Sequence, residues 1–382
     1  MHLVLLRTLR YRGISVRTGY VCLILALASV ESVAQAPRSW RLAQQPAFSI
    51  GQRDGDSPAA FGNVVGVAEI GAGVVVADGQ AMALKFFDRA GRSTSVSGRV
   101  GGGPGEYRTI KSIHRCGADR LFVYDPGAMR LSVLSSKGTY LRAIDVRSLS
   151  ASGAPPYEIA CNPNGVFAYT HRAPMPPSGV GPRRPSVAIT LSSRDGGDVT
   201  LGTFPASERY FDGSNDFPRP LGKVTSVAVG TEIVVIGTGE GDSLLVVSLR
   251  DRARRVVRII RPVRRLTSEH ISEFVADQLA RRVGRADTAS LRQFYSALEY
   301  PATLPPYRRI ILDAADRLWV EDYALPGAKT VRWTILDREG RVLATLSCPS
   351  NFEFAEVGMN SVRGVWRDEL GVQWIREYDI ER

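Results

Sequence analysis

Three of the four histidines are the first residues to consider for metal or acid–base chemistry. His114, His171 and His270 stand 57 and 99 residues apart along the chain. Zinc sites draw their His and Cys ligands largely from closely spaced pairs, and no such pair joins these histidines. A Gly-x-Ser-x-Gly nucleophile motif is also absent from the sequence. The residue pattern therefore predicts no catalytic residue, no cofactor and no histidine metal site.

Two short acidic clusters are candidates for a calcium site. One holds Asp54 and Asp56, and the other holds Asp212, Ser214 and Asp216. Calcium prefers carboxylate and carbonyl oxygens, but neither cluster follows the full pattern of a calcium-binding loop. Aspartate and serine at alternate positions are typical of turns, so the sequence predicts turns at both places.

Arginines crowd one short segment of the chain. They are Arg250, Arg252, Arg254, Arg255, Arg258, Arg261, Arg264 and Arg265. Aliphatic residues alternate with them in a predicted strand over 254–261. One interpretation is an outer edge strand whose charge prevents pairing with other chains. The other is a surface for an anionic partner, such as a polysaccharide, a lipid headgroup or a cell-surface polymer.

Composition and length limit the fold class. The chain has 382 residues, 44% hydrophobic and 23% charged, which is ordinary for a globular protein and excludes extended disorder. Gly and Pro number 37 and 22, so many turns are expected and long helices are not. The length fits two or three domains or one large all-β body. The formal net charge is +11, mostly from arginine.

The N-terminal segment resembles an export signal. Residues 1–20 contain four arginines and no acid, 21–30 are apolar, and small residues follow at Ser32, Ala34 and Ala36. The apolar run is shorter than the ~20 residues of a spanning helix. We therefore expect a Sec-type signal peptide over 1–34, cleaved after Ala34. The mature protein, 35–382, would be periplasmic or extracellular, would not span a membrane, and would carry a net charge of +8.

A repeat runs through the mature chain. Asp78 and Asp125 follow similar apolar runs and lie 47 residues apart, as do Gly91 and Gly138. Apolar runs of strand length, separated by turn residues, continue in weaker copies to the C-terminus. Such a period indicates one supersecondary unit per repeat.

The repeat predicts an all-β fold, a six-bladed β-propeller of four-stranded blades, as one domain over 35–382. The last unit shows only three strands, and the stretch 40–50 is a strand without a unit of its own. The N-terminal strand would therefore complete the last blade and close the ring. Apolar residues at helical spacing within 267–300 predict a helical hairpin inserted between blades 4 and 5. This hairpin would either cover one mouth of the channel or pack on the rim.

Cys116 and Cys161 occupy equivalent positions in neighbouring repeats. Each stands five residues before the first apolar residue of the next strand, Leu121 or Val166. Both would lie at the ends of innermost strands in adjacent blades. In an oxidising compartment they would form either a disulfide or two buried free thiols, and the sequence leaves both alternatives open.

A glycine-rich segment carries a family resemblance. The run from Arg99 to Tyr107 reads Arg-Val-Gly-Gly-Gly-Pro-Gly-Glu-Tyr. It resembles the Gly-x-Gly-Pro-Gly-Glu-Phe signature that heads repeats in NHL-type propellers, and the whole mature chain is most similar to exported bacterial six-bladed propeller proteins. Within it, Gly101, Gly103, Pro104, Gly105 and Glu106 would form the crossing between two blades. The glycines would allow positive φ angles, and Glu106 would hold the crossing through hydrogen bonds.

The resemblance implies a fold more than an activity. NHL-fold lyases need a histidine-rich zinc site, which this chain does not offer. Lactonase-type propellers hold calcium on the axis, so axial calcium remains an alternative. We expect a monomeric binding module whose ligand, a small molecule, a glycan or a protein, sits at one face near the channel, and we expect no nucleic-acid partner. The alternatives are a metal-dependent lactonase- or lyase-like hydrolase and an accessory protein associated with the outer membrane.

Overall fold

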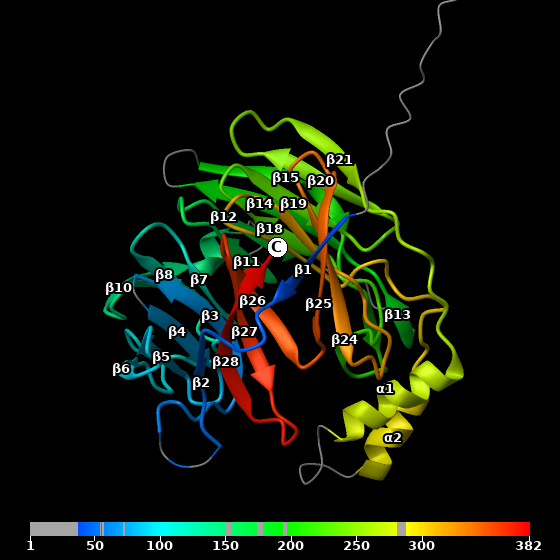
Figure 1. The fold of residues 1–382 in the computed structure, drawn as a ribbon, viewed down its shortest axis with the longest axis horizontal. Coiled ribbons are helices and arrows are strands. Elements are labelled where there is room, and N and C mark those ends of the chain that lie inside the picture. The colour runs from blue at the N-terminus through cyan, green and yellow to red at the C-terminus, as the bar shows by residue number, and fades with distance from the viewer. Residues whose placement is uncertain are drawn as a thin grey trace, which may run out of the picture. The chain divides into compact units, whose positions relative to one another are not determined.

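Short strands follow one another in antiparallel sheets (Figure 1). The computed structural model describes residues 37–53, 55, 57–71, 73–149, 154–173, 179–193, 197–280 and 288–382. The first sheet contains β3 (Val64–Ile70), β4 (Gly73–Asp78), β5 (Ala83–Asp88) and β6 (Ser93–Ser97). The second contains β7 (Ser112–Arg115), β8 (Arg120–Asp125), β9 (Arg130–Ser135) and β10 (Tyr140–Asp145). The third contains β11 (Glu158–Cys161), β12 (Phe167–Arg172), β14 (Ser186–Ser193) and β15 (Gly197–Pro205).

The C-terminal half repeats the pattern. The fourth sheet contains β18 (Ser226–Val229), β19 (Ile233–Gly237), β20 (Ser243–Ser248) and β21 (Arg254–Arg258). A fifth antiparallel group contains β22 (Arg309–Leu312), β23 (Leu318–Glu321), β24 (Thr330–Leu336) and β25 (Val342–Pro349). The last group contains β26 (Phe352–Val357), β27 (Ser361–Arg367) and β28 (Gln373–Glu381).

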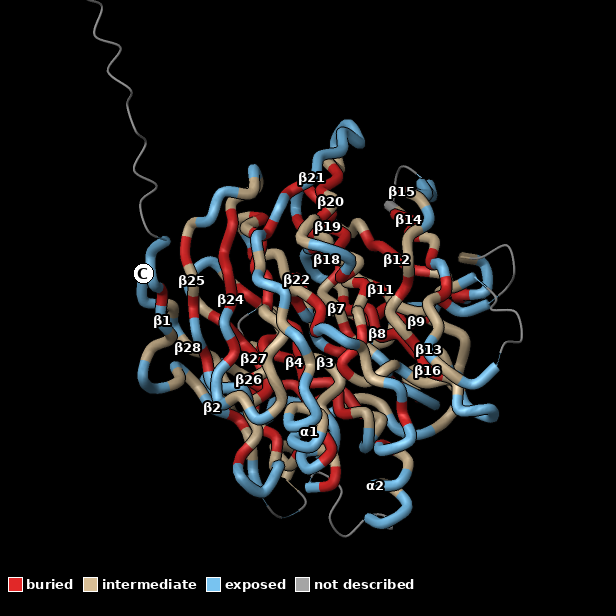
Figure 2. The backbone as a smooth tube through the Cα atoms, turned by 90° about the vertical axis from the view of Figure 1, so that its right-hand side faces the viewer, coloured by how far each residue is buried: buried red, intermediate tan, exposed pale blue. Residues whose placement is uncertain are grey.

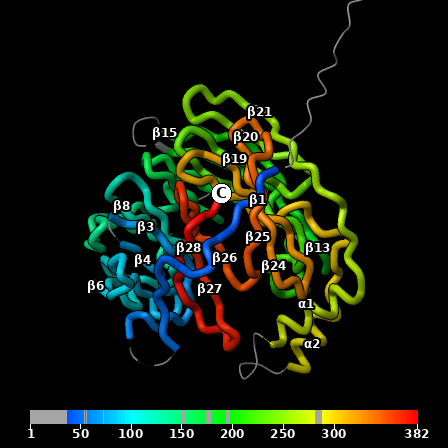
Figure 3. Tube along the Cα trace, in the orientation of Figure 1, coloured from blue at the N-terminus to red at the C-terminus, as the bar shows by residue number. Residues whose placement is uncertain are grey.

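The N-terminal strands join the last two groups. In β1 (Arg38–Leu42), Arg38 to Trp40 pair in parallel with β25, and the next two residues pair antiparallel with β28. The following strand, β2 (Phe48–Ile50), also pairs with β28. Figure 3 shows the blue N-terminal strand beside the red C-terminal one. The first and last strands therefore belong to the same sheet.

The first strands of the groups form a closed circuit. Strand β3 contacts β7, β7 contacts β11, β11 contacts β18, β18 contacts β22, β22 contacts β26, and β26 contacts β3. Because each group runs outward from such a strand, the sheets surround a common axis. The chain is thus all-β apart from its helices, with the arrangement of a β-propeller, as the repeat predicts.

The hydrophobic core lies between neighbouring sheets. One cluster joins Val75 and Leu84 of the first sheet to Ile113 and Leu121 of the second. Runs that are apolar on both faces, such as Val74 to Val76, are buried because sheets cover them on both sides. Figure 2 shows the buried segments along these strands and exposed residues over the helices.

Two helices and a small three-stranded sheet lie outside the six groups of strands. Helices α1 (Ser268–Ala280) and α2 (Thr288–Ser296) lie within the predicted insertion 267–300. A small sheet of β13 (Gly181–Arg183), β16 (Arg209–Phe211) and β17 (Asp216–Pro218) packs against them, with the Phe217 and Phe294 rings 5.2 Å apart. A short 3-10 helix, η1 (Val146–Leu149), follows β10.

Some sequence predictions fall outside the described residues or differ from the structure. The predicted signal peptide, 1–34, and Asp54 and Asp56 lie outside the described residues. The sequence also predicts an extended surface loop over the proline-rich stretch 173–185. Its residues 181–183 instead form β13, because they pair with β16. The arginine-rich strand ends at Arg258, earlier than predicted, because the Ile259 N–H donates to the Asp242 carbonyl outside the ladder.

Candidate functional site

The candidate site is the cavity enclosed by the six first strands. It has a volume of about 640 Å³ and takes lining residues from β3, β7, β11, β18, β22 and β26. A side chamber of about 320 Å³, called here the Lys111 chamber, shares Ser112 and His114 with it. A second of about 200 Å³, called the Trp333 chamber, shares Glu353 and Arg367. Volumes of this order suit a small-molecule ligand.

The second strand of each of the first two sheets ends in an aspartate, Asp78 or Asp125, and both carboxylates are buried. Asp125 accepts backbone N–H groups of Arg108 at 2.9 Å and Thr109 at 3.1 Å, which holds the chain entering the sheet. In the first sheet, the Asp78 carboxylate accepts the backbone N–H groups of Gly62 and Asn63 and so holds the chain that enters this sheet.

The later second strands end in other residues, namely Arg172 in β12, Gly237 in β19, Glu321 in β23 and Arg367 in β27. In the fifth group the aspartate itself is kept as Asp322, because Arg317 to Asp322 repeats the pattern of Arg120 to Asp125. Glu321 and Arg367 line the Trp333 chamber.

The Trp333 chamber is built on an arginine–carboxylate network. The Glu321 carboxylate accepts from Arg308 Nη1 at 3.1 Å and from Arg309 Nε at 3.0 Å. Arg367 Nη1 donates to Glu353 Oε2 at 3.3 Å. Burial would raise the pKa of Glu353, but Arg309, Arg308 and Arg367 outweigh it and hold that pKa below its usual range. Glu353 therefore keeps its charge at neutral pH.

Two arginines lining the central cavity keep unused donors. Arg309 Nη2 and Arg115 Nε are buried and have no hydrogen-bond partner among the described residues. Arg309 is otherwise held by Glu321 and by the Phe354 carbonyl, 2.8 Å from Nη1. Arg115 forms no ion pair with any residue that the structure describes. Because buried donors are normally satisfied, these two are available to a ligand.

A second charged cluster lies in the same cavity, around Arg363. This guanidinium contacts Glu356 at 2.9 Å and Glu377 at 2.5 Å, and Glu69 lies 3.9 Å away. Glu356 Oε2 also accepts the Glu69 backbone N–H at 2.9 Å, which links the last sheet to the first. Burial raises the pKa of Glu356 to about 7, although Arg363 opposes this shift. Glu356 therefore titrates near neutral pH.

The Lys111 chamber has a different character. Burial lowers the pKa of Lys111 and raises that of Glu158, and both side chains line the chamber. Lys111 donates to the Tyr157 carbonyl, and its Nζ lies 4.3 Å from the centre of the Tyr157 ring. Burial also lowers the pKa of His114 to about 4, so this histidine is neutral at physiological pH.

The predicted metal candidates remain separate in the structure. His114 lines the central cavity, His171 lies in β12 against Tyr169, and His270 lies in the first turn of α1. Asp212 accepts backbone N–H groups of a turn, and Asp216 pairs with Arg209 at 2.6 Å. Across the ranges that the structure describes, no three His, Cys, Asp or Glu residues come together as a metal site.

The glycine-rich segment lies between β6 and β7, away from the cavity lining. Glu106 accepts from the Gly103 N–H at 2.8 Å and from Arg99 at 2.6 Å. Arg130 donates to the carbonyls of Gly102, Gly103 and Glu106. Gly105, which follows Pro104, has a φ of 73°, and a Cβ on Gly101 would lie 2.2 Å from Glu106 Oε2. The crossing role of Gly101, Gly103, Pro104, Gly105 and Glu106 stays a prediction.

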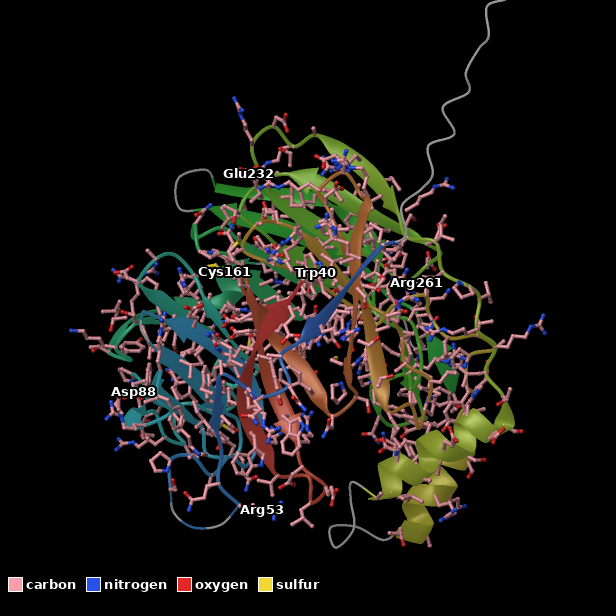
Figure 4. All side chains as sticks on the ribbon, viewed as in Figure 1. Trp40, Arg53, Asp88, Cys161, Glu232 and Arg261 are labelled. Carbon is pink, nitrogen blue, oxygen red and sulfur yellow. A yellow bond between two sulfur atoms is a disulfide. The ribbon has the colours of Figure 1, made fainter. Side chains whose placement is uncertain are left out.

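The turns after the first strands are linked from sheet to sheet. Cys116 and Cys161 are joined by a disulfide with Cα atoms 5.4 Å apart. Asn162 Nδ2 donates to the Gly230 carbonyl at 2.6 Å, and Asp316 accepts the Thr231 N–H at 2.6 Å. Arg317 Nη2 continues the series to the Met359 carbonyl at 3.1 Å. We call these links the turn belt; Figure 4 labels Cys161 within it.

Removing the disulfide is expected to loosen the turn belt. A Cys116→Ser, Cys161→Ser variant should unfold about 2–4 kcal/mol more easily than the wild type, because the bridge closes a loop of 45 residues. Urea unfolding under non-reducing conditions measures this difference. Thiol labelling of the unfolded wild-type protein should find one reactive cysteine, Cys348, in the mature chain. Three reactive thiols would show that the bridge does not form.

The described part of the helical hairpin does not line the three cavities. None of their lining residues comes from α1 or α2. Instead Val275, Leu279, Tyr295 and Leu298 pack with Tyr210 of β16. Of the two alternatives open from the sequence, these contacts favour packing on the rim.

Sequence reasoning missed the arginines of the cavity. Arg115, Arg309 and Arg367 are terminal residues of their strands and Arg363 lies within β27, so the pattern alone predicts only sheet edges or faces.

Comparison with known proteins gives the fold. No family model and no curated protein matches the sequence. Among solved structures, a DUF4221 family member from Bacteroides vulgatus is 12% identical, with a TM-score of 0.53, over 91% of this chain and 99% of that one. Virginiamycin B lyase from Staphylococcus aureus is 11% identical (TM-score 0.42; 89% and 99% covered). The calcium-binding protein regucalcin from Agrobacterium tumefaciens is 10% identical (TM-score 0.41; 90% and 96% covered).

Proposed function

We propose that this chain is an exported six-bladed β-propeller that binds a small anionic molecule in its central cavity. The blade count rests on the circuit of six first strands, and the closure of the ring rests on the pairing of β1 and β2 with β28. Export rests on the predicted signal peptide, with a periplasmic or extracellular mature chain acting as a monomer. No described helix is long and apolar enough to cross a membrane.

The unused donors of Arg115 and Arg309 carry the proposal. Both residues line the cavity, from β7 and β22, which lie on opposite sides of the circuit of first strands. A guanidinium N–H that is buried without an acceptor costs free energy, and a ligand carboxylate or phosphate would remove that cost. Arg309 is already positioned by Glu321, so little side-chain freedom would be lost on binding.

The residues that line the cavity limit the chemical class of the ligand further. Val64, Val67 and Ile311 line the cavity beside the charged groups, so a ligand with apolar and anionic parts fits it. The carboxylates of Glu353 and Glu356, each paired with an arginine, can accept further hydrogen bonds. Hydroxyl or amine groups of a ligand would therefore also find partners. A sugar acid or another small polar carboxylate has this combination.

A lactonase- or lyase-like hydrolase with an axial metal, calcium included, is the alternative. It needs several oxygen or nitrogen ligands that converge on the axis. Among the residues that the structure describes, no three His, Cys, Asp or Glu side chains come together as a metal site. The proposal of a binding module rests on the unused donors of Arg115 and Arg309.

Replacing Arg115 by methionine tests the proposal. Calorimetric titration of the mature protein should detect binding of an anionic probe among inorganic phosphate, citrate and D-glucuronate, and no binding of glucose. Arg115→Met should weaken that binding roughly 10- to 100-fold, because a charge-assisted hydrogen bond is lost.

The matched control is Arg142→Met, which removes an exposed arginine from the outermost strand of the same sheet. It should leave the affinity unchanged. Equal loss in both variants, or no loss in Arg115→Met, would count against the cavity as the binding site. Calcium-dependent binding would instead support the metal alternative.

A further inference from the structure

One surface outside the cavity has an unusual composition. It consists of β21 and the chain that follows it, residues 254–265, which we call the basic rim. In Figure 1 this chain leaves β21 and passes along the outside of the sheets toward α1, and Figure 4 labels Arg261 on that side. Because β21 is the outer strand of its sheet, the basic rim faces away from the central cavity.

Positive charge concentrates on the basic rim and its leading turn. Residues 250–265 contain eight arginines and one acid, Asp251, so this segment carries +7 of the +11 formal charge. Arg258 and Arg265 are exposed and form no ion pair with the described residues. Arg261 is the exception, since its Nε lies 2.7 Å from Asp322.

Two arginine side chains of the basic rim are held by the neighbouring sheets. Arg254 donates to the Leu201 carbonyl of the preceding sheet, and Arg255 donates to the Arg338 carbonyl of the following one. Val257 and Ile259 are buried against the fifth group of strands. The alternate residues Val256, Arg258 and Ile260 are exposed.

Three aliphatic side chains stand among these arginines. Ile260 is 87% exposed, Val263 is 79% exposed and Val256 is 63% exposed. Isolated exposed aliphatics are ordinary, but three within eight residues of a positively charged edge are not. An edge protected by charge alone would have no need for them.

We propose that the basic rim docks the protein on an anionic lipid surface. The guanidinium groups would contact lipid phosphates, while Ile260 and Val263 would enter the interface between headgroups and acyl chains. A polysaccharide would use the arginines but would gain little from the aliphatic side chains. The combination of both residue types therefore favours a lipid surface. This inference is independent of the function proposed for the central cavity.

Vesicle co-sedimentation tests the proposal on the full mature protein. Vesicles of phosphatidylcholine with ~30% phosphatidylglycerol should bind it, and pure phosphatidylcholine vesicles should bind at least tenfold less, as expected when basic residues meet an anionic surface. Binding should weaken steeply as salt rises, because the charges lie at the surface. An Arg258→Glu, Arg265→Glu variant should lose about tenfold or more in partitioning.

A variant without the exposed aliphatic side chains distinguishes a lipid surface from a polyanion. Ile260→Ser with Val263→Ser keeps every charge, and it should weaken vesicle binding about fivefold or more. Leu370→Ser, which changes a 75% exposed leucine of the last sheet, is the matched control and should have no effect. The circular dichroism of each variant verifies its fold.

Two results would overturn the proposal. Equal binding to neutral and anionic vesicles, or none to either, would exclude an anionic lipid surface. Binding to dextran sulfate together with vesicle binding that is unchanged in the Ile260→Ser, Val263→Ser variant would indicate a polyanion surface instead.

Discussion

Replacing Asp78 by alanine should lower the free energy of unfolding by about 4 kcal/mol, because breaking a buried ion pair leaves its partner without compensation. The Asp78 carboxylate is buried and lies 2.8 Å from Lys85 Nζ, which is also buried. It also accepts N–H groups from Gly62 at 3.1 Å and Asn63 at 3.2 Å. The substitution would thus leave an ammonium and several amides without their acceptor.

The pH dependence of Asp78 follows from the same contacts. Burial alone would raise its pKa, but hydrogen bonds from Lys85, Gly62 and Ala81 outweigh burial and lower it. The folded pKa therefore lies below the unfolded value, so this stabilisation is present at neutral pH and is lost as the pH falls through the folded pKa. The difference between wild type and Asp78→Ala should shrink in strong acid.

Urea unfolding measures the loss, and two variants control it. Asp119→Ala removes an exposed turn aspartate and should change the free energy by about 0.5 kcal/mol or less. Asp78→Ala with Lys85→Met should recover part of the stability, because no buried charge is left unpaired. A loss of less than about 1 kcal/mol in Asp78→Ala would show that the carboxylate does not hold the crossing.

Replacing Arg363 by methionine should destabilise the protein by about 3 kcal/mol at pH 8. Its side chain is 10% exposed and compensates Glu356 and Glu377, which are 32% and 17% exposed. Glu69, which lies 3.9 Å from the same guanidinium, adds a third carboxylate. Without the arginine, these groups would repel one another in a confined space. Arg363→Lys keeps the charge and should lose less stability.

The cost of Arg363→Met should fall at lower pH. The folded pKa of Glu356, about 7, lies above its ordinary value of 4.5, so the folded protein binds more protons than the unfolded chain between these two values. For this carboxyl, wild-type stability therefore decreases as the pH rises through that window. At pH 5 Glu356 is protonated, so the missing guanidinium leaves less charge uncompensated. A destabilisation that is equal at pH 5 and pH 8 would contradict this account.

The repeat predicts the strands well because burial on both sides of a sheet leaves a direct mark in the sequence. Runs such as Val74 to Val76 and Ile233 to Ile236 have no polar residue, and they form β4 and β19. Within the orphan stretch 40–50, Arg41, Leu42 and β2 pair with β28, which would otherwise expose a free edge.

Other parts could not be read from local patterns. The small sheet brings Arg183 of β13 beside Arg209 of β16, and no periodicity connects segments so far apart. The Arg309–Glu321 pair likewise joins residues whose proximity exists only after β22 and β23 align. Charged residues inside a ring resemble exposed residues in the sequence, because both interrupt apolar runs.

The two ends of the first strands have different roles in this account. The turn belt links the sheets through Cys116–Cys161, Asn162 and Asp316, which favours a rigid ring. At the other end, Arg309 begins β22, and Glu321 and Arg367 end β23 and β27. Arg115 is the last residue of β7 and precedes Cys116 of the turn belt, so unused donors stand toward both ends of the cavity. A rigid frame of this kind is suited to holding a ligand with little reorganisation.

Diffraction from crystals of the mature protein, soaked in the anionic probe that binds most tightly in calorimetry, tests the central claim most directly. The account predicts the probe in the central cavity, with an acidic oxygen within hydrogen-bond distance of Arg115 Nε or Arg309 Nη2. A probe bound only outside this cavity, or an empty cavity at a saturating concentration, would contradict it.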